Sequence, residues 1–130
     1  MPIRWSISHA ERLVVARTQG VVTLKDVEGY LDAVVVEGAM PYAKIFDATD
    51  IEPHATDADM MALGARMRAY VATMDGGPLA FVATTDVAMA FISRYLNLTN
   101  ARRPVKICTK LEDAQRWLDS LPRQVTPAKS

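Results

Sequence analysis

The chain has 130 residues, of which half are apolar and 23% are charged, a composition typical of a folded globular domain rather than a disordered segment. Fifteen basic residues balance fifteen acidic ones, so the chain lacks the excess positive charge that dominates affinity for nucleic acids. The single cysteine excludes an intramolecular disulfide, and no apolar run approaches the ~20 residues that cross a bilayer. We therefore expect a cytoplasmic protein with no nucleic-acid partner and no integral membrane segment.

The first elements are predicted to be two strands followed by a helix. Apolar and polar residues alternate over residues 3–7, and a second apolar run, rich in valine, follows at 13–16. The polar step between these runs is too short for a parallel crossover, so we expect an antiparallel hairpin. Thr23 and Asp26 then form a capping box at the start of a helix that ends at Gly38.

A third strand and a second helix follow in the middle of the chain. The strand is predicted at residues 42–47, and a polar, acidic loop connects it to the helix. Thr56 and Asp59 form a second capping box, and apolar residues recur at helical spacing as far as Met74.

The rest of the chain continues the alternation of strands and helices. Strands are predicted at residues 79–84 and 104–109, each followed by a helix, and Trp117 is predicted to be a core anchor of the last helix. The order ββαβαβαβα predicts an α/β fold, a mostly parallel sheet with an antiparallel N-terminal strand and helices packed on it. We expect one domain over residues 1–121 and a flexible tail over residues 122–130.

The densest polar cluster lies between the third strand and the second helix. Its carboxylates and histidine could coordinate a hard cation, but acidic residues are also favoured at a helix N-terminus by the helix dipole. We therefore expect a capped, solvated loop without a metal. Ligands and partners usually bind at the carboxyl ends of strands in open α/β sheets, so this loop is the predicted partner-binding or switch surface. Its candidate residues are Asp47, Asp50, His54, Thr56 and Asp57.

Motifs of the common enzyme classes are missing from the sequence. It contains no Gly-x-Ser-x-Gly, Gly-x-Gly-x-x-Gly, His-Glu-x-x-His or Cys-x-x-Cys pattern. Cys108 lies next to Ile107 in an apolar strand, where it is most simply a small buried hydrophobe. Arg102 and Arg103 form only a pair and are expected to lie in a solvated loop. We expect a non-enzymatic protein without a cofactor.

The methionines of the second helix have two interpretations. Such a stripe usually belongs to a core, yet methionines also line adaptable apolar surfaces that bind ligands, partner proteins or a second copy of the chain. An apolar pocket between the second and third helices would make the protein a carrier or sensor of a small lipid-like ligand. The residues that would line this pocket are Met60, Gly64, Met67, Phe91 and Tyr95.

Four short strings, spread over about residues 3–121, carry a family resemblance. They are Tyr42-Ala-Lys-Ile-Phe-Asp47, Met61-Ala-Leu-Gly-Ala-Arg66, Gly77-Pro-Leu-Ala-Phe-Val82 and Leu111-Glu-Asp-Ala-Gln-Arg-Trp-Leu118. In order and spacing they resemble small bacterial STAS-like, or SpoIIAA-like, proteins of uncharacterised function. The resemblance implies a fold that includes anti-sigma factor antagonists, cytoplasmic domains of anion transporters and, more distantly, lipid-carrying domains.

The resemblance to the antagonists also implies a switch residue. In those proteins a partner kinase phosphorylates a Ser or Thr at the start of the second helix, and the matching position here is Thr56. The antagonists read Asp-Ser-Ser-Gly or Asp-Thr-Ser-Gly there, whereas this chain reads Ala55-Thr56-Asp57-Ala58 and lacks the leading acid and the glycine. Capping of the helix is a sufficient structural role for Thr56. The implied function is a regulatory domain that binds a protein partner through residues 47–59 and the exposed side of the second helix.

Overall fold

The computed structural model describes residues 2–99 and 103–122, so most of the predicted tail lies outside the described residues. The elements in chain order are β1 (Ile3–Ser8), β2 (Leu13–Thr23), α1 (Leu24–Val36), β3 (Ala43–His54), α2 (Asp57–Thr73), β4 (Leu79–Val82), α3 (Asp86–Thr99), β5 (Val105–Cys108) and α4 (Leu111–Ser120). The strands form one sheet in the order β1-β2-β3-β4-β5, with β1 antiparallel to β2 and the other pairs parallel. This arrangement confirms the predicted fold class.

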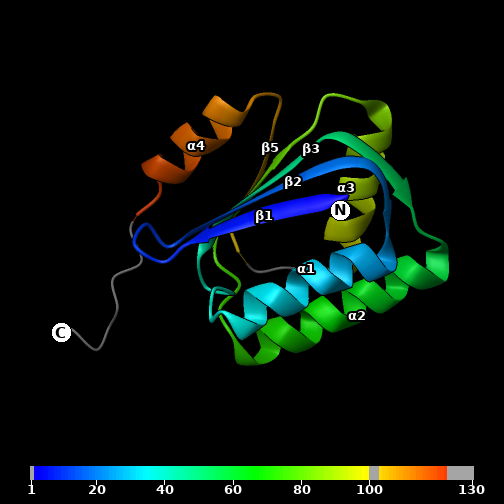
Figure 1. The fold of residues 1–130 in the computed structure, drawn as a ribbon, viewed down its shortest axis with the longest axis horizontal. Coiled ribbons are helices and arrows are strands. Elements are labelled where there is room, and N and C mark those ends of the chain that lie inside the picture. The colour runs from blue at the N-terminus through cyan, green and yellow to red at the C-terminus, as the bar shows by residue number, and fades with distance from the viewer. Residues whose placement is uncertain (1, 100–102, 123–130) are drawn as a thin grey trace.

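The helices cover the two faces of the sheet unequally. Helices α1, α2 and α3 lie on one face, and α4 lies on the other (Figure 1). The alternation of side chains in β3 follows this division, since Phe46 packs in the larger core with α1 and α3 whereas Ile45 packs towards α4. Helix α2 packs against α1 and α3 and so forms an outer layer over them. None of the helices in the described part of the chain is both long and apolar enough to span a membrane.

Strand β3 continues through the segment that was predicted to be an acidic loop. The long strand β2 supplies its ladder partners, because residues 19–23 of β2 pair with residues 50–54 of β3. Strand β4 ends opposite Asp47, so the last part of β3 pairs on one side only within the described sheet. Pro53 has no N–H to donate and is tolerated in such an edge-like segment. The loop prediction is therefore wrong, and the polar side chains of this segment project from a strand.

The predicted starts of α1 and α2 are confirmed by reciprocal hydrogen bonds. The Thr56 hydroxyl accepts from the backbone N–H of Asp59 at 3.0 Å, and the Asp59 carboxylate accepts from the backbone N–H of Thr56 at 3.0 Å. Thr23 and Asp26 form the same capping box at the start of α1. Each box satisfies N–H groups that would otherwise lack a partner in the first helical turn.

Helix α4 sits less deeply on the sheet than the sequence predicts. Ala114 is its fully buried residue, whereas Trp117 and Leu118 are partly buried. Trp117 packs at the edge of a small cluster that contains Ile45 and the buried thiol of Cys108. Cys108 is thus a buried hydrophobe as predicted, but Trp117 covers a cluster and is not a core anchor.

Candidate functional site

The predicted switch residues lie along the end of β3 and the start of α2 without enclosing a site. Asp50, His54, Thr56 and Asp57 are exposed to solvent, and Asp47 is half-buried. No group of three or more His, Cys, Asp or Glu side chains in residues 2–99 and 103–122 could hold a metal ion. This segment therefore presents separate polar side chains to water.

Two of the predicted carboxylates, those of Asp47 and Asp57, already have partners. Asp47 accepts hydrogen bonds from the backbone N–H of Thr49 at 3.0 Å and from its hydroxyl. Asp57 forms an ion pair with Arg94 of α3, and Thr56 is engaged in the α2 cap. These contacts explain the polar residues as parts of a turn, a cap and a surface ion pair.

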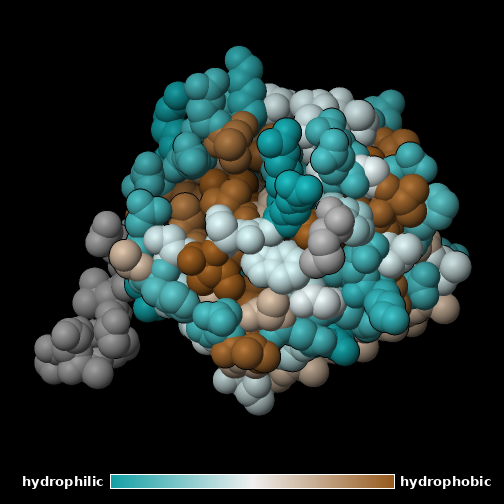
Figure 2. All heavy atoms as spheres, in the orientation of Figure 1, coloured by the Kyte–Doolittle hydropathy of each residue, from teal (hydrophilic) through white to brown (hydrophobic). Residues whose placement is uncertain are grey.

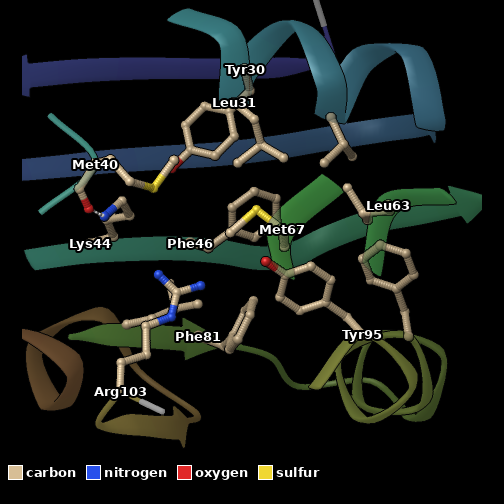
Figure 3. Close-up of a pocket in the computed structure, with 13 residues that line it drawn as sticks. Tyr30, Leu31, Met40, Lys44, Phe46, Leu63, Met67, Phe81, Tyr95 and Arg103 are labelled. Carbon is tan, nitrogen blue, oxygen red and sulfur yellow. Dashed lines mark hydrogen bonds between the residues drawn. The ribbon is translucent and has the colours of Figure 1, made fainter. Parts of the chain in front are cut away.

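A different part of the molecule contains an apolar cavity. The cavity lies between the sheet and helices α1, α2 and α3 and has a volume of about 50 Å³ (Figure 3). Phe46 and Phe81 line it from the sheet, and Leu63 and Met67 line it from α2. On the face of the molecule seen in Figure 2, hydrophobic residues form separate patches among hydrophilic ones.

Aromatic rings form a continuous row across the sheet face beneath the helices. Trp5 contacts Tyr30 with ring centroids 5.6 Å apart, and Tyr30 contacts Phe46 at 5.8 Å. The row continues from Phe46 to Phe81 at 6.0 Å and from Phe81 to Tyr95 at 6.1 Å. All four contacts have edge-to-face geometry, which is the favoured arrangement of aromatic pairs. Four of these rings line the cavity, Phe46 and Phe81 from the sheet and Tyr30 and Tyr95 from helices α1 and α3.

The cavity only partly coincides with the pocket predicted from the methionine stripe. The predicted residues that line it are Met67, Phe91 and Tyr95. Met60 and Gly64 are also buried, but they do not line the cavity. A Cβ atom on Gly64 would lie 2.9 Å from the Cβ atom of Leu98, so this glycine lets α2 approach α3 closely. The cavity thus has walls from α2 and α3, as predicted, and further walls from α1 and the sheet.

Lys44 lies at one end of the cavity with a side chain that is only 4% exposed. Its Nζ atom donates to the carbonyl oxygens of Gly76 at 2.7 Å and Tyr42 at 2.9 Å, and also to that of Met40. Three acceptors match the three N–H donors of an ammonium group. Lys44 therefore connects the segment before β3 with the loop before β4 while its alkyl chain lines the cavity.

Neighbouring charges and burial together set the acidity of Lys44. Burial, and after it the positive charge of Arg103, lowers the pKa of Lys44 from 10.5 to about 7, while the charge of Asp75 acts in the opposite direction. Near neutral pH the ammonium form is therefore held mainly by its three carbonyl acceptors and by nearby negative charge.

Arg103 reaches the same end of the cavity from the segment before β5. Its Nη1 atom donates to the carbonyl oxygen of Gly76 at 2.8 Å, whereas its Nε atom is buried and has no acceptor among the described residues. Figure 3 shows the guanidinium pointing into the cavity between Lys44 and Tyr95. The prediction of a solvated loop is therefore wrong for Arg103, and Arg102 lies outside the described residues.

Two buried tyrosines add hydroxyl groups to this otherwise apolar site. Tyr30 is 3% exposed and Tyr95 is 8% exposed. Burial is the main cause that raises the pKa of each phenol, although the positive charge of Arg103 acts to lower both. Both side chains therefore stay protonated at ordinary pH and remain able to donate a hydrogen bond.

The sequence contained a signal for Lys44 but none for Arg103. Lys44 stands two residues before Phe46 in an apolar strand, so both side chains project from the same face of the sheet. The central strands of a parallel sheet are buried on both faces, which means that a lysine at this position must also be buried. Arg103 lies in a loop and reaches the cavity only because β5 pairs with β4.

No protein-family model and no curated protein sequence matches the chain, but solved structures do. An uncharacterised protein of the DUF3478 family with a SpoIIAA-like fold, from Shewanella loihica, superposes with a TM-score of 0.60 at 16% identity, covering 89% of this chain and 93% of its own. An anti-sigma factor antagonist from Mycobacterium paratuberculosis gives a TM-score of 0.58 at 14% identity, covering 91% and 95%. The chain therefore has a SpoIIAA-like fold, and the resemblance to STAS-like domains is confirmed at the level of fold.

Proposed function

We propose that this SpoIIAA-like domain is a non-enzymatic carrier or sensor that binds a small apolar molecule in the cavity between its sheet and helices α1, α2 and α3. The cavity is the single observation that carries the proposal. Its volume of about 50 Å³ exceeds the roughly 10–15 Å³ that one water molecule needs, and its walls are mostly apolar. Walls of this kind lose dispersion contacts when nothing fills the space between them, so an apolar guest is stabilised there.

The size of the cavity limits the ligand. Typical clefts for drug-sized molecules measure roughly 300–1,000 Å³, far more than this cavity. A cavity that holds benzene measures about 150 Å³, roughly three times this volume, so we infer a ligand whose apolar body is at most a single ring or a short chain and whose entry requires the lining side chains to move apart. Met67 and Met40 line the cavity and have unbranched, adaptable side chains that accommodate such variation in shape.

Binding of neutral probes such as benzyl alcohol and 1-hexanol tests this proposal. We expect both probes to bind to the purified protein in calorimetry and to raise its unfolding temperature. Met67→Phe, which fills the cavity, should weaken binding about tenfold or more. Met61→Phe is the matched control on the same helix, because Met61 is 61% exposed and should leave binding unchanged. If neither probe binds to the wild-type protein, the cavity is only a packing defect and the proposal fails.

A second function, binding of a protein partner, is favoured by the position of Thr56. This residue is exposed at the junction of β3 and α2, where the resemblance to the antagonists implies phosphorylation. We propose that a partner contacts residues 47–59 and the exposed side of α2, which includes Met61. Phosphate on Thr56 would stand beside Asp57 and Asp59 and would make the charge of this surface more negative.

Substitutions at Thr56 distinguish a switch from a simple helix cap. Native mass spectrometry of the purified protein first shows the number of subunits and any co-purified protein. If Thr56 controls association, Thr56→Glu should release that protein while Thr56→Ser retains it. Equal association of both folded variants would show that the residue only caps α2.

A further inference from the structure

We propose that the ligand of this cavity carries one carboxylate group, which the Lys44 and Arg103 end binds while the apolar body lies against Phe46 and Phe81. This inference rests on the proposed function, because it names the chemical class of ligand for the same cavity. Three features of the cavity support it: an unpaired hydrogen-bond donor of Arg103, the two neighbouring positive charges of Lys44 and Arg103, and the neutral hydroxyl groups of Tyr30 and Tyr95.

The unpaired donor belongs to the guanidinium of Arg103. Its Nη1 atom is satisfied by the carbonyl of Gly76, but its buried Nε atom has no acceptor in residues 2–99 and 103–122. A buried donor of a charged group without an acceptor is strongly unfavourable. The planar guanidinium has the geometry that matches the two oxygens of a carboxylate, so a carboxylate ligand would supply the missing acceptor.

The sheet brings two positive charges to the same place. Lys44 pairs in register with Leu79 of β4, and Leu79 pairs with Val105 of β5, two residues after Arg103. Both cations therefore stand at the amino ends of β3 and β5, the two parallel strands that flank β4, and Figure 3 shows both side chains at one end of the cavity. None of the described lining residues is acidic. The two cations repel each other, and an anion placed between them removes that repulsion.

The balance of charge favours a monoanion. Asp75, in the loop between α2 and β4, already acts on Lys44 with its negative charge. Near pH 7 Lys44 is only partly protonated, so Arg103, Lys44 and Asp75 together leave less than one full positive charge, which a single carboxylate group is sufficient to balance. A phosphate dianion would exceed that balance and would carry a larger cost of desolvation in an apolar cavity.

The tyrosines supply the remaining polar contacts. Tyr30 and Tyr95 both line the cavity and keep their protons, so their hydroxyl groups can donate to an anion. In Figure 3 the Tyr95 hydroxyl points towards the middle of the cavity, on the side of Arg103. The Tyr95 hydroxyl, a neutral donor, is therefore directed towards the part of the cavity in which Arg103 would bind an anion.

Matched pairs of probes test the inference. Benzoate and benzyl alcohol share a ring, and hexanoate and 1-hexanol share a chain, so each pair differs only in the polar group. At pH 7 we expect calorimetry to show that the wild-type protein binds each carboxylate about tenfold or more tightly than its alcohol. Arg103→Met keeps most of the apolar volume and should reduce the ratio of carboxylate to alcohol affinity to about one. Arg94→Met, outside the cavity on α3, is the matched control and should keep the preference.

The outcomes separate this inference from the proposed function. If the alcohols bind and the carboxylates bind no better, the cavity binds apolar molecules but the inference is wrong. If phenyl phosphate binds more tightly than benzoate, the assignment to a carboxylate is wrong. If no probe binds, both proposals fail. Should Arg103→Met not fold, Tyr95→Phe provides a second variant, which should lower the ratio of carboxylate to alcohol affinity several-fold.

Discussion

Strand β3 carries polar side chains at both of its ends, and the two ends satisfy them in opposite ways. At the carboxyl end, Asp50 and His54 are exposed, and Asp47 is bonded to a neighbour two residues away. At the amino end, Lys44 is buried and depends on carbonyl groups from two separate loops. The polar residues at the carboxyl end are close together in the sequence, but water surrounds them. The groups at the amino end are far apart in the sequence, and the fold brings them together. Burial, and not the density of polar residues, therefore marks the candidate site.

This difference predicts that backbone changes near the amino end are the most disruptive. Gly77 has a φ of +70°, and a Cβ atom on it would lie 2.3 Å from the carbonyl oxygen of Tyr42. Gly77→Ala must therefore displace the loop that carries Gly76, and we expect a loss of about 3 kcal/mol in the free energy of unfolding. Gly38 has the same φ but open space around it, so Gly38→Ala should cost about 1 kcal/mol. Equal losses in urea denaturation would contradict this explanation.

The buried ammonium predicts a dependence of stability on pH. The pKa of Lys44 is about 7 in the folded protein and 10.5 in the unfolded chain, so the unfolded chain binds more protons between these values. The free energy of unfolding should therefore rise with pH above 7, by about 2 kcal/mol up to pH 9, where the neighbouring Tyr30 and Tyr95 remain protonated. Urea denaturation of wild type and Lys44→Met measures this, and the variant should lose the rise. Lys25→Met, at an exposed position, should keep it; a flat wild-type profile would refute the prediction.

The cap at the carboxyl end predicts a smaller effect. Thr56→Ala removes the hydroxyl oxygen that accepts from the Asp59 N–H, and should reduce the free energy of unfolding by about 1 kcal/mol. Thr56→Ser keeps the oxygen and should be nearly neutral. A loss well above 2 kcal/mol for the alanine variant would show that Thr56 does more than cap α2.

The surface ion pair at this end predicts the smallest effect. Asp57 is 94% exposed in its side chain and Arg94 is 46% exposed, so water screens their attraction. We expect Asp57→Asn to change the free energy of unfolding by less than about 0.5 kcal/mol. A larger loss in the free energy of unfolding, which disappears when Asp57→Asn is made in the Arg94→Met background, would contradict this expectation. It would show that the ion pair contributes to stability despite its exposure to water.

Local patterns in the sequence were sufficient for most of the fold. The hairpin, both capping boxes and the three parallel strands depend on hydrophobic period and on residues close in sequence, so they could be predicted. The extension of β3 could not, because its ladder depends on the length of β2 and not on its own composition. Trp117 is less buried than predicted because α4 packs on its face of the sheet without a second described helix beside it, which leaves part of the indole ring exposed.

The candidate site was harder to predict than the fold. Met67, Phe91 and Tyr95 belong to helical stripes, so a pocket could be inferred from them, but helix packing decides which residues close it. The lack of a side chain at Gly64 suggests space for a ligand, but Leu98 occupies the space beside this glycine. Gly64→Leu would therefore disturb the contact of α2 with α3.

Methyl NMR of the methionines reports both whether a ligand binds to the protein and whether it binds in the cavity. Met40 and Met67 line the cavity, whereas Met61 is exposed on the outer side of α2. On titration with benzyl alcohol, the account predicts saturable shifts of the Met40 and Met67 methyl signals and an unchanged Met61 signal. Shifts confined to Met61, or no saturable shift at any methionine, would contradict the account.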